Sequence, residues 1–136
     1  MKVTELMIGD WVSYNGHSVL VEALNKSNGY AIEKDMISIK LNDDTCLGIN
    51  AERLEPLRVT DEIILKNGFK ITEQNEMGYI HYEIEEPEYV EIENFSRHFT
   101  LTIWSYSDIV YHKDISYVHE IQHAFKNHDV EKEIIV

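Results

Sequence analysis

The sequence contains little cysteine, few basic side chains and no long apolar run, and each scarcity excludes a class of protein. The single cysteine, Cys46, cannot form an internal disulfide, which points to a reducing compartment. No stretch approaches the roughly 20 apolar residues of a membrane span, and the first residues lack the apolar run of a signal peptide. These absences predict a cytoplasmic protein that does not interact with membranes.

Positive charge is scarce as well. The chain has 12 Lys and Arg against 25 Asp and Glu, which gives a net charge of −13. The arginines, Arg53, Arg58 and Arg97, are far apart in the sequence and form no basic stripe. Such a chain repels nucleic-acid phosphates, so we expect no direct binding to nucleic acid and favour a protein partner, including a basic one.

Several catalytic motifs are also missing. The sequence has no glycine-rich phosphate loop, no Gly-x-Ser-x-Gly elbow and no Cys-x-x-Cys pair. Cys46 is followed by Leu47 and Ile49, a context that predicts a buried, small apolar residue rather than a nucleophile. The protein is therefore expected not to be an enzyme unless a metal supplies the chemistry.

Residues 1–58 have the pattern of a series of short strands and tight turns. Asn15-Gly16 suits a type I′ turn, so residues 11–14 should form a hairpin with residues 18–24. Alternating apolar residues predict further strands at 30–32 and 37–41. Because closing a sheet removes its exposed edges, residues 1–58 are predicted to form a small β-barrel-like module.

Residues 59–136 show a different pattern. Thr60 is predicted to cap a short helix over 61–66, which Asn67-Gly68 ends. Period-two alternation then predicts an antiparallel sheet, with strands at 69–71, 79–85, 89–92, 99–104 and 109–111.

A final helix is predicted to cover one face of that sheet. Its apolar stripe consists of Ile115, Val118, Ile121, Gln122 and Phe125, and Asp114 is a candidate N-cap. The chain is thus expected to be α+β, with the sheet-and-helix half, 59–136, packed on the barrel-like half.

Two resemblances follow from these segments. The stretch 8–12, with Asn15-Gly16 and residues 19–24, resembles the opening hairpin of small barrels of the Src-homology-3-like type. The order of residues 8–12, 54–57, 63–69 and 117–123 resembles a group of uncharacterised proteins of gut Bacteroidetes and their phages and mobile elements. The second resemblance spans nearly the whole chain and implies an architecture, but no activity.

The segment His119-Glu120-Ile121-Gln122-His123 is the strongest candidate for catalysis. Two histidines four residues apart share a helix face and can bind zinc, and the intervening Glu120 could activate a zinc-bound water. A third ligand is hard to supply, since His128 follows His123 by five residues without the glycine of the elongated motif. We favour structural histidines and no cofactor, with zinc at His119 and His123 as the alternative.

Two other groups could form a binding surface. Trp11, Tyr14 and Tyr30 could line a groove for an extended peptide, although core packing gives aromatic residues the same sequence signature. Residues 83–93 are rich in carboxylates around Pro87, which is typical of a solvated hairpin and alternatively of a surface for a cation or a basic partner.

The sequence leaves two function hypotheses. The favoured one is a non-catalytic protein-interaction module associated with a phage or mobile element, which could act by mimicking nucleic acid at a basic site of a host protein. The alternative is a small zinc-dependent hydrolase that uses His119, Glu120 and His123.

Overall fold

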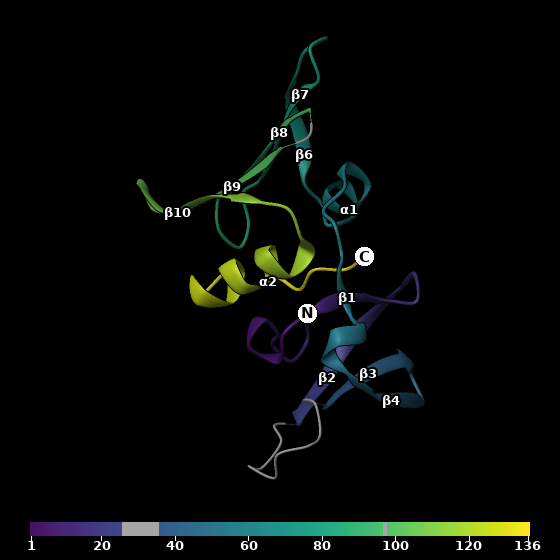
Figure 1. Cartoon of the computed structure of the whole chain (residues 1–136). Helices are drawn as coiled ribbons and strands as arrows, with labels where there is room; N and C mark the ends of the chain where they lie inside the picture. The colour runs from purple at the N-terminus through teal and green to yellow at the C-terminus, as the bar shows by residue number, and fades with distance from the viewer. Residues whose placement is uncertain (26–35, 97) are drawn as a thin grey trace. The chain divides into compact units, whose positions relative to one another are not determined.

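The computed structural model describes residues 1–25, 36–96 and 98–136 of the chain. The chain divides into two compact units, Met1–Leu57 and Arg58–Val136. Each unit contains one antiparallel sheet of five strands, and the second also contains the main helix, so the predicted α+β class is confirmed (Figure 1). The strand expected at residues 30–32 lies outside the described residues, as does Tyr30.

The first sheet has the strand order β4-β3-β2-β1-β5. Its strands are β1 (Trp11–Tyr14), β2 (His17–Asn25), β3 (Met36–Asn42), β4 (Thr45–Asn50) and β5 (Glu55–Pro56), with short 3-10 helices at Val3–Glu5 and Ala51–Arg53. Asn15 and Gly16 join β1 to β2 with φ of 50° and 79°, as a type I′ turn requires. The predicted hairpin is therefore present. No strand pairing among the described residues joins the edge strands β4 and β5 into a closed barrel.

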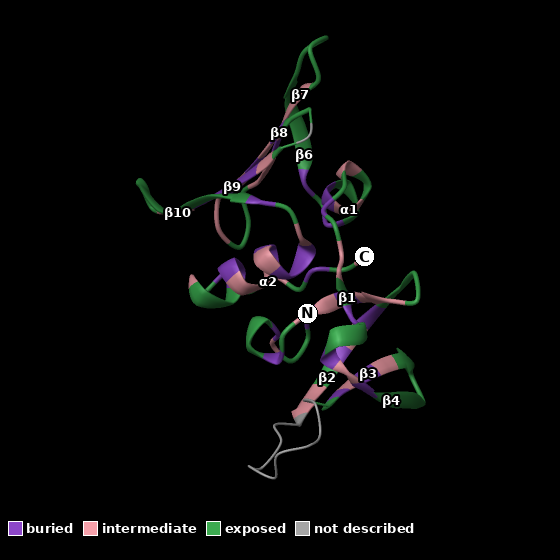
Figure 2. Cartoon of the chain, in the orientation of Figure 1, coloured by how far each residue is buried: buried purple, intermediate pink, exposed green. Residues whose placement is uncertain are grey.

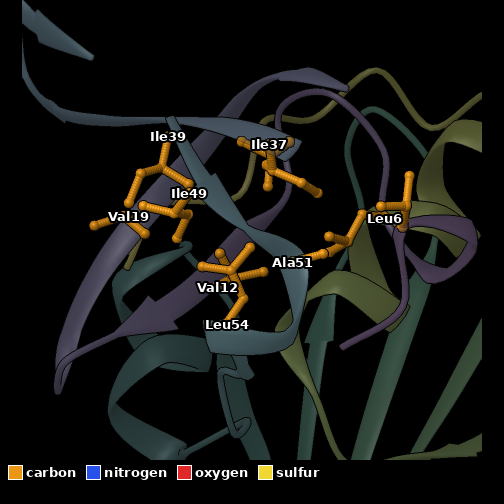
Figure 3. Close-up of a cluster of buried hydrophobic side chains, with 10 residues drawn as sticks. Leu6, Val12, Val19, Ile37, Ile39, Ile49, Ala51 and Leu54 are labelled. Carbon is orange, nitrogen blue, oxygen red and sulfur yellow. The ribbon is translucent and has the colours of Figure 1, made fainter. Parts of the chain in front are cut away.

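One face of the first sheet forms the core of its unit. Register partners on this face are apolar on both strands, as in Val12 with Val19 and Val21 with Ile39. Figure 3 shows Val12, Val19 and Ile39 converging with Ile37, Ile49 and Leu54. The exposed fraction of each of these side chains, and of Val21, is 4% or less. Burial of these β-branched and leucine side chains supplies the main stabilisation of the unit.

The strand β4 corrects one prediction from the sequence. Cys46, which was expected to be buried, is exposed on this edge strand, and Leu47 is 36% exposed. Only the end of β4 enters the core, where Ile49 is 4% exposed. An edge strand has a partner on one side only, so its apolar residues are not all covered.

The second sheet is a simple meander with the order β10-β9-β8-β7-β6. Its strands are β6 (Lys70–Gln74), β7 (Tyr79–Ile84), β8 (Val90–Phe95), β9 (Phe99–Ser105) and β10 (Asp108–Ile115). Each strand pairs with the next through a short connection, as the period-two pattern predicts. The strand predicted at 109–111 is longer than expected and extends through Ile115.

One face of this sheet is apolar. Tyr82, Ile92 and Leu101 are successive register partners across β7, β8 and β9, and each is at most 1% exposed. Figure 2 shows the buried residues concentrated along β8 and β9. Because successive residues of a strand point to opposite faces, the residues between them form a second, polar face.

The first helix, α1 (Asp61–Lys66), begins and ends as the sequence predicts. The Thr60 hydroxyl accepts a hydrogen bond from the Ile63 N–H, and Gly68 after the helix has a φ of 84°. Asp61 also connects the helix to the sheet, because its carboxylate accepts hydrogen bonds from the Tyr82 hydroxyl and the Asn94 amide. Burial and this hydrogen bond raise the pKa of Tyr82.

The second helix, α2 (Val118–Asn127), begins later than predicted. Its N-cap is Tyr117, whereas Asp114 and Ile115 lie in β10, so the predicted cap at Asp114 is wrong. The helix buries Val118, Ile121, Ala124 and Phe125 and contacts β10, where the Tyr111 ring lies 5.4 Å from the His128 ring. Among the described residues, no helix is long and apolar enough to cross a membrane.

Asn67 fixes the last residues of the chain beside α1. Its side-chain amide donates to the Ile135 carbonyl at 2.7 Å and accepts from the Ile135 N–H at 2.9 Å. The same amide donates to the Ile63 carbonyl at 2.8 Å, and Asn67 is 5% exposed. One buried side chain thus satisfies backbone groups of two segments that are distant in the sequence.

Candidate functional site

The residues proposed as a binding surface in the first unit line two hollows. Trp11 borders one of about 210 Å³, together with Leu20 and Lys40. Tyr14 borders another of about 400 Å³. Both hollows include Ser18 and Leu41, so they adjoin one another on the sheet. The third aromatic of the predicted surface, Tyr30, is outside the described residues.

The two aromatic residues differ in their surroundings. Tyr14 packs against the buried cluster of its unit, and the Arg53 guanidinium lies 5.5 Å from the centre of its ring. Trp11 is half-buried, and the neighbouring Leu41 side chain is 45% exposed. The first unit therefore presents partly exposed apolar surface next to a fixed aromatic ring, which is suited to contact with another polypeptide.

In the second unit, the histidines of the predicted zinc motif lie on α2. His119 is 9% exposed, and its ring stacks on Tyr117 with 5.8 Å between the ring centres. The His123 ring lies edge-on to His119 at 5.5 Å. These contacts place His119 among packed side chains at the start of the helix.

Glu120 has a structural role at the start of α2. Its carboxylate accepts hydrogen bonds from the backbone N–H groups of Ser116 and Tyr117, at 2.7 and 2.8 Å. This is the capping-box arrangement, in which an acidic side chain satisfies N–H groups that the helix itself cannot pair. A carboxylate engaged in this way is poorly placed to activate a zinc-bound water.

The polar face of the second sheet carries a set of ionisable residues in register. One row across the strands consists of Lys70, Glu83, Glu91, Thr102 and His112. The neighbouring row consists of Glu73, His81, Glu93, Thr100 and Asp114. Pairing of the strands thus gathers residues that are up to 42 positions apart in the chain, as Lys70 and His112 are.

Three residues of these rows form a compact group: His81, Glu83 and Glu91. One nitrogen or oxygen of each lies within 4.8 Å of the others, and all three residues are partly buried. The distance between His81 Nε2 and Glu91 Oε1 is 3.3 Å. Among the described residues, no other group of three or more His, Cys, Asp or Glu residues has this geometry, and His119 and His123 are not part of one.

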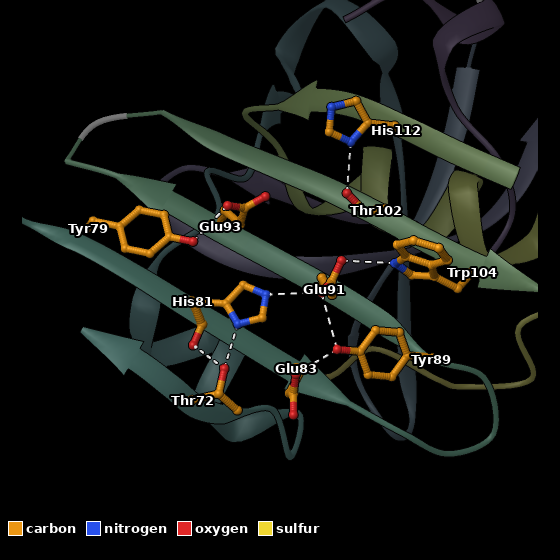
Figure 4. Close-up of polar contacts among 10 residues, drawn as sticks. All are labelled: Thr72, Tyr79, His81, Glu83, Tyr89, Glu91, Glu93, Thr102, Trp104 and His112. Carbon is orange, nitrogen blue, oxygen red and sulfur yellow. Dashed lines mark hydrogen bonds and ion pairs between the residues drawn. The ribbon is translucent and has the colours of Figure 1, made fainter. Parts of the chain in front are cut away.

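Neighbouring hydrogen-bond donors hold the carboxylates in place (Figure 4). The Tyr89 hydroxyl lies 2.7 Å from Glu83 Oε2 and 3.2 Å from Glu91 Oε1. The Trp104 indole N–H donates to Glu91 Oε2 at 2.9 Å. The Tyr79 hydroxyl donates to Glu93 Oε2 at 2.7 Å. The acidic segment is therefore not simply a solvated hairpin, since Glu83, Glu91 and Glu93 have specific partners.

The carboxylates in turn perturb the tyrosines. Burial, together with the hydrogen bond to Glu93, raises the pKa of Tyr79 to about 12. The hydrogen bond to Glu83 raises the pKa of Tyr89, with burial and Glu91 adding to the effect. Both shifts have the direction expected when a phenolate would form beside fixed negative charge.

Inspection of the sequence alone did not identify His81, Glu83 and Glu91 as a group. Glu83 and Glu91 belong to the acidic segment, and His81 and Glu83 have the i, i+2 spacing of one strand face. That spacing was the available signal. The missing information was the register of β7 against β8, which places Glu83 opposite Glu91.

Comparisons of this chain with protein-family models, with curated proteins and with solved structures found no match.

Proposed function

We propose that this protein is a non-catalytic interaction module that binds an extended, basic segment of a partner protein on its first sheet. The observation that supports this most directly is the pair of adjoining hollows that Trp11 and Tyr14 border and that share Ser18 and Leu41. An extended segment is long and narrow enough to place alternate side chains in two such hollows.

The resemblance of the first hairpin to Src-homology-3-like barrels supports the same function. Domains of that type bind extended peptides in grooves lined by aromatic residues. In this chain the corresponding aromatics would be Trp11 and Tyr14. The association with phages or mobile elements likewise rests on sequence resemblance and remains part of the proposal.

The charge of the chain supports a basic partner. A net charge of −13 attracts positively charged segments at long range. Asp43 borders the Trp11 hollow, and its fully exposed carboxylate is 3.8 Å from the Lys40 ammonium. Because such exposed ion pairs contribute little, a lysine or arginine of the partner can replace Lys40 at low cost.

Selection of random 12-residue peptides on the immobilised protein tests this function. We expect enrichment of peptides that combine Lys or Arg with apolar residues, and binding that weakens as salt rises. Leu41→Ser should weaken binding at least tenfold, and Trp11→Ser should do the same provided that circular dichroism shows it folded.

The matched control is Tyr106→Ser, which removes a fully exposed aromatic residue of the second unit and should leave peptide affinity unchanged. The proposal is wrong if no peptide is enriched, or if the enriched peptides bind the Leu41→Ser variant as tightly as the unaltered protein.

A further inference from the structure

We propose that His81, Glu83 and Glu91 bind one divalent transition-metal ion of the Zn²⁺ class on the polar face of the second sheet. This site is separate from the peptide-binding surface and from the histidines of α2. One imidazole nitrogen and two carboxylates are a donor set that Zn²⁺ accepts, and three protein ligands leave one tetrahedral position open.

The spacing of the donor atoms fits such an ion. With bonds of about 2.0–2.1 Å, two ligands of a tetrahedral Zn²⁺ lie about 3.3–3.4 Å apart. His81 Nε2 and Glu91 Oε1 are already 3.3 Å apart. The Glu83 oxygen lies within 4.8 Å of both and can close this distance by rotation of its own side chain.

One tautomer of His81 leaves its Nε2 available to a metal ion. His81 Nδ1 is hydrogen-bonded to the Thr72 hydroxyl, which also lies 3.5 Å from the His81 carbonyl oxygen. This pair of contacts fits two tautomers: the hydroxyl donates to Nδ1, or it accepts from Nδ1–H and points its own hydrogen to the carbonyl. In the second tautomer the Nε2 lone pair faces the Glu91 carboxylate at 3.3 Å, and a metal ion can bind between them.

The surrounding hydrogen bonds have the pattern found around metal ligands. Thr72 orients the imidazole through the nitrogen that would not bind the metal. Trp104 holds Glu91 Oε2 and so turns Oε1 toward His81. The Tyr89 hydroxyl lies within hydrogen-bonding distance of both Glu83 and Glu91 and so holds the two carboxylates close together.

The charge of the face also favours a cation. Glu83 and Glu91 are direct register partners, and like charges placed opposite each other across strands destabilise a sheet. Glu93 adds a third carboxylate opposite His81, whereas Lys70, opposite Glu83, is the basic residue nearest in register. A divalent ion would relieve this repulsion more fully than the single hydroxyl proton of Tyr89 does.

An ion can reach the site from solvent. Thr72 and Glu83 line a surface hollow of about 400 Å³, which Gly68 and Lys70 also border. The group is therefore neither sealed in the core nor spread over an open surface. Partial burial strengthens the attraction between ion and carboxylates relative to fully solvated groups.

Calorimetric titration with Zn²⁺ tests the proposal on the tag-free chain after removal of metals with a chelator. We expect one ion per chain at pH 7.5. His81→Asn and Glu91→Gln should each weaken Zn²⁺ binding by more than about 100-fold, and Trp104→Phe by about 10–100-fold, as for other groups that orient a ligand.

The chain offers closely matched controls. Glu93→Gln removes a carboxylate from the same strand and the same face as Glu91, yet Glu93 is outside the group. It should leave the Zn²⁺ affinity within a few-fold of the original value. His123→Ala tests the alternative site on α2 and should have no effect.

Two spectroscopic measurements test the metal site independently of calorimetry. Co²⁺ should give the visible absorption bands of a four-coordinate site, and these bands should be absent in His81→Asn. Zn²⁺ should change the tryptophan fluorescence of the original chain but not that of Trp104→Phe, because Trp104 contacts a ligand directly.

The proposal is overturned if the original chain binds no stoichiometric Zn²⁺. It is also overturned if Zn²⁺ binding survives in folded His81→Asn and Glu91→Gln. Equal loss of Zn²⁺ binding in Glu93→Gln would overturn it as well, because it would show that the ion is attracted by negative charge alone. Loss of Zn²⁺ binding in His123→Ala would place the ion on α2 instead. None of these results depends on whether the first sheet binds a peptide.

Discussion

The two sheets of this protein have the same number of strands, but the faces that point away from their cores carry different kinds of side chain. In the first sheet, the face away from the core carries a half-buried tryptophan beside a shallow hollow, which an exposed leucine also borders. In the second, the corresponding face carries carboxylates, imidazoles and hydroxyls that bond to one another across the strands. A solvent-facing sheet surface can thus present unsatisfied apolar area or a polar network, and the two favour different ligands.

The units also differ in how they are connected internally. The core cluster of the first unit is apolar, and the buried Asp10 beside it accepts a hydrogen bond from the nearby Met7 N–H. The second unit adds polar connections, through Asp61 to the sheet and through Asn67 to the end of the chain. We therefore expect truncation of a buried apolar side chain to lower the free energy of unfolding by similar amounts in both units. Loss of a single polar group should lower it more in the second unit.

The largest effect should come from truncating one core residue in each sheet. Ile37→Ala in the first and Leu101→Ala in the second remove side chains that are fully buried. Each should lower the free energy of unfolding by about 2–5 kcal/mol. Denaturant unfolding measures this, with Trp11 reporting on the first unit in a Trp104→Phe background and Trp104 on the second in a Trp11→Phe background. A much smaller loss for Ile37→Ala would show that the first core is loosely packed.

The next effect should distinguish the units. Asp61→Ala leaves the buried Tyr82 hydroxyl and Asn94 amide without their shared acceptor, so we expect a loss of about 2–4 kcal/mol. Tyr82→Phe should lower the free energy of unfolding by less, because it removes the hydroxyl itself and leaves no buried donor without a partner. Chemical denaturation of both variants gives the comparison. Equal costs would mean that Asp61 contributes little beyond that one hydrogen bond.

A smaller effect is expected at the start of α2. Glu120→Ala removes the acceptor for two backbone N–H groups and should cost about 0.3–1.5 kcal/mol, whereas Glu120→Gln can retain part of the cap. Thermal unfolding followed by circular dichroism measures both. Neither substitution should alter Zn²⁺ affinity. A loss of metal binding in Glu120→Gln would restore the zinc-hydrolase hypothesis.

The smallest effect concerns alkaline pH and the polar face. The pKa of Tyr79 is about 12 in the folded chain, above its usual value of 10.0. Folding therefore favours the protonated phenol, and this contribution is complete below pH 10 and is lost as pH rises toward 12. Tyr79→Phe should flatten the decline of unfolding free energy between pH 10 and 12. Glu93→Gln should flatten it in part, and an unchanged slope in both variants would contradict the assigned cause.

Local signals in the sequence predicted much of the backbone. Asn15-Gly16 specified the first hairpin, Thr60 the start of α1 and Gly68 its end, because each requirement is set by a few adjacent residues. The strands of the second sheet followed from alternation. Such signals do not depend on the rest of the fold.

The errors arose where tertiary context decides. Cys46 has apolar neighbours, yet it lies on an edge strand that nothing in the described residues covers on its outer side. Asp114 is a good capping residue by type, but pairing with Thr100 keeps it in β10. The His81, Glu83 and Glu91 group depends on strand register, which no local pattern specifies.

The contact between Asn67 and Ile135 has a consequence for synthesis on the ribosome. The two residues are 68 positions apart, and at about 5–20 residues per second the ribosome needs about 3–14 s to pass from one to the other. During that interval the buried amide of Asn67 lacks its final partners. All five strands of the first sheet have been synthesised by residue 56, whereas the contacts that fix Asn67 at the end of α1 must wait for Ile135.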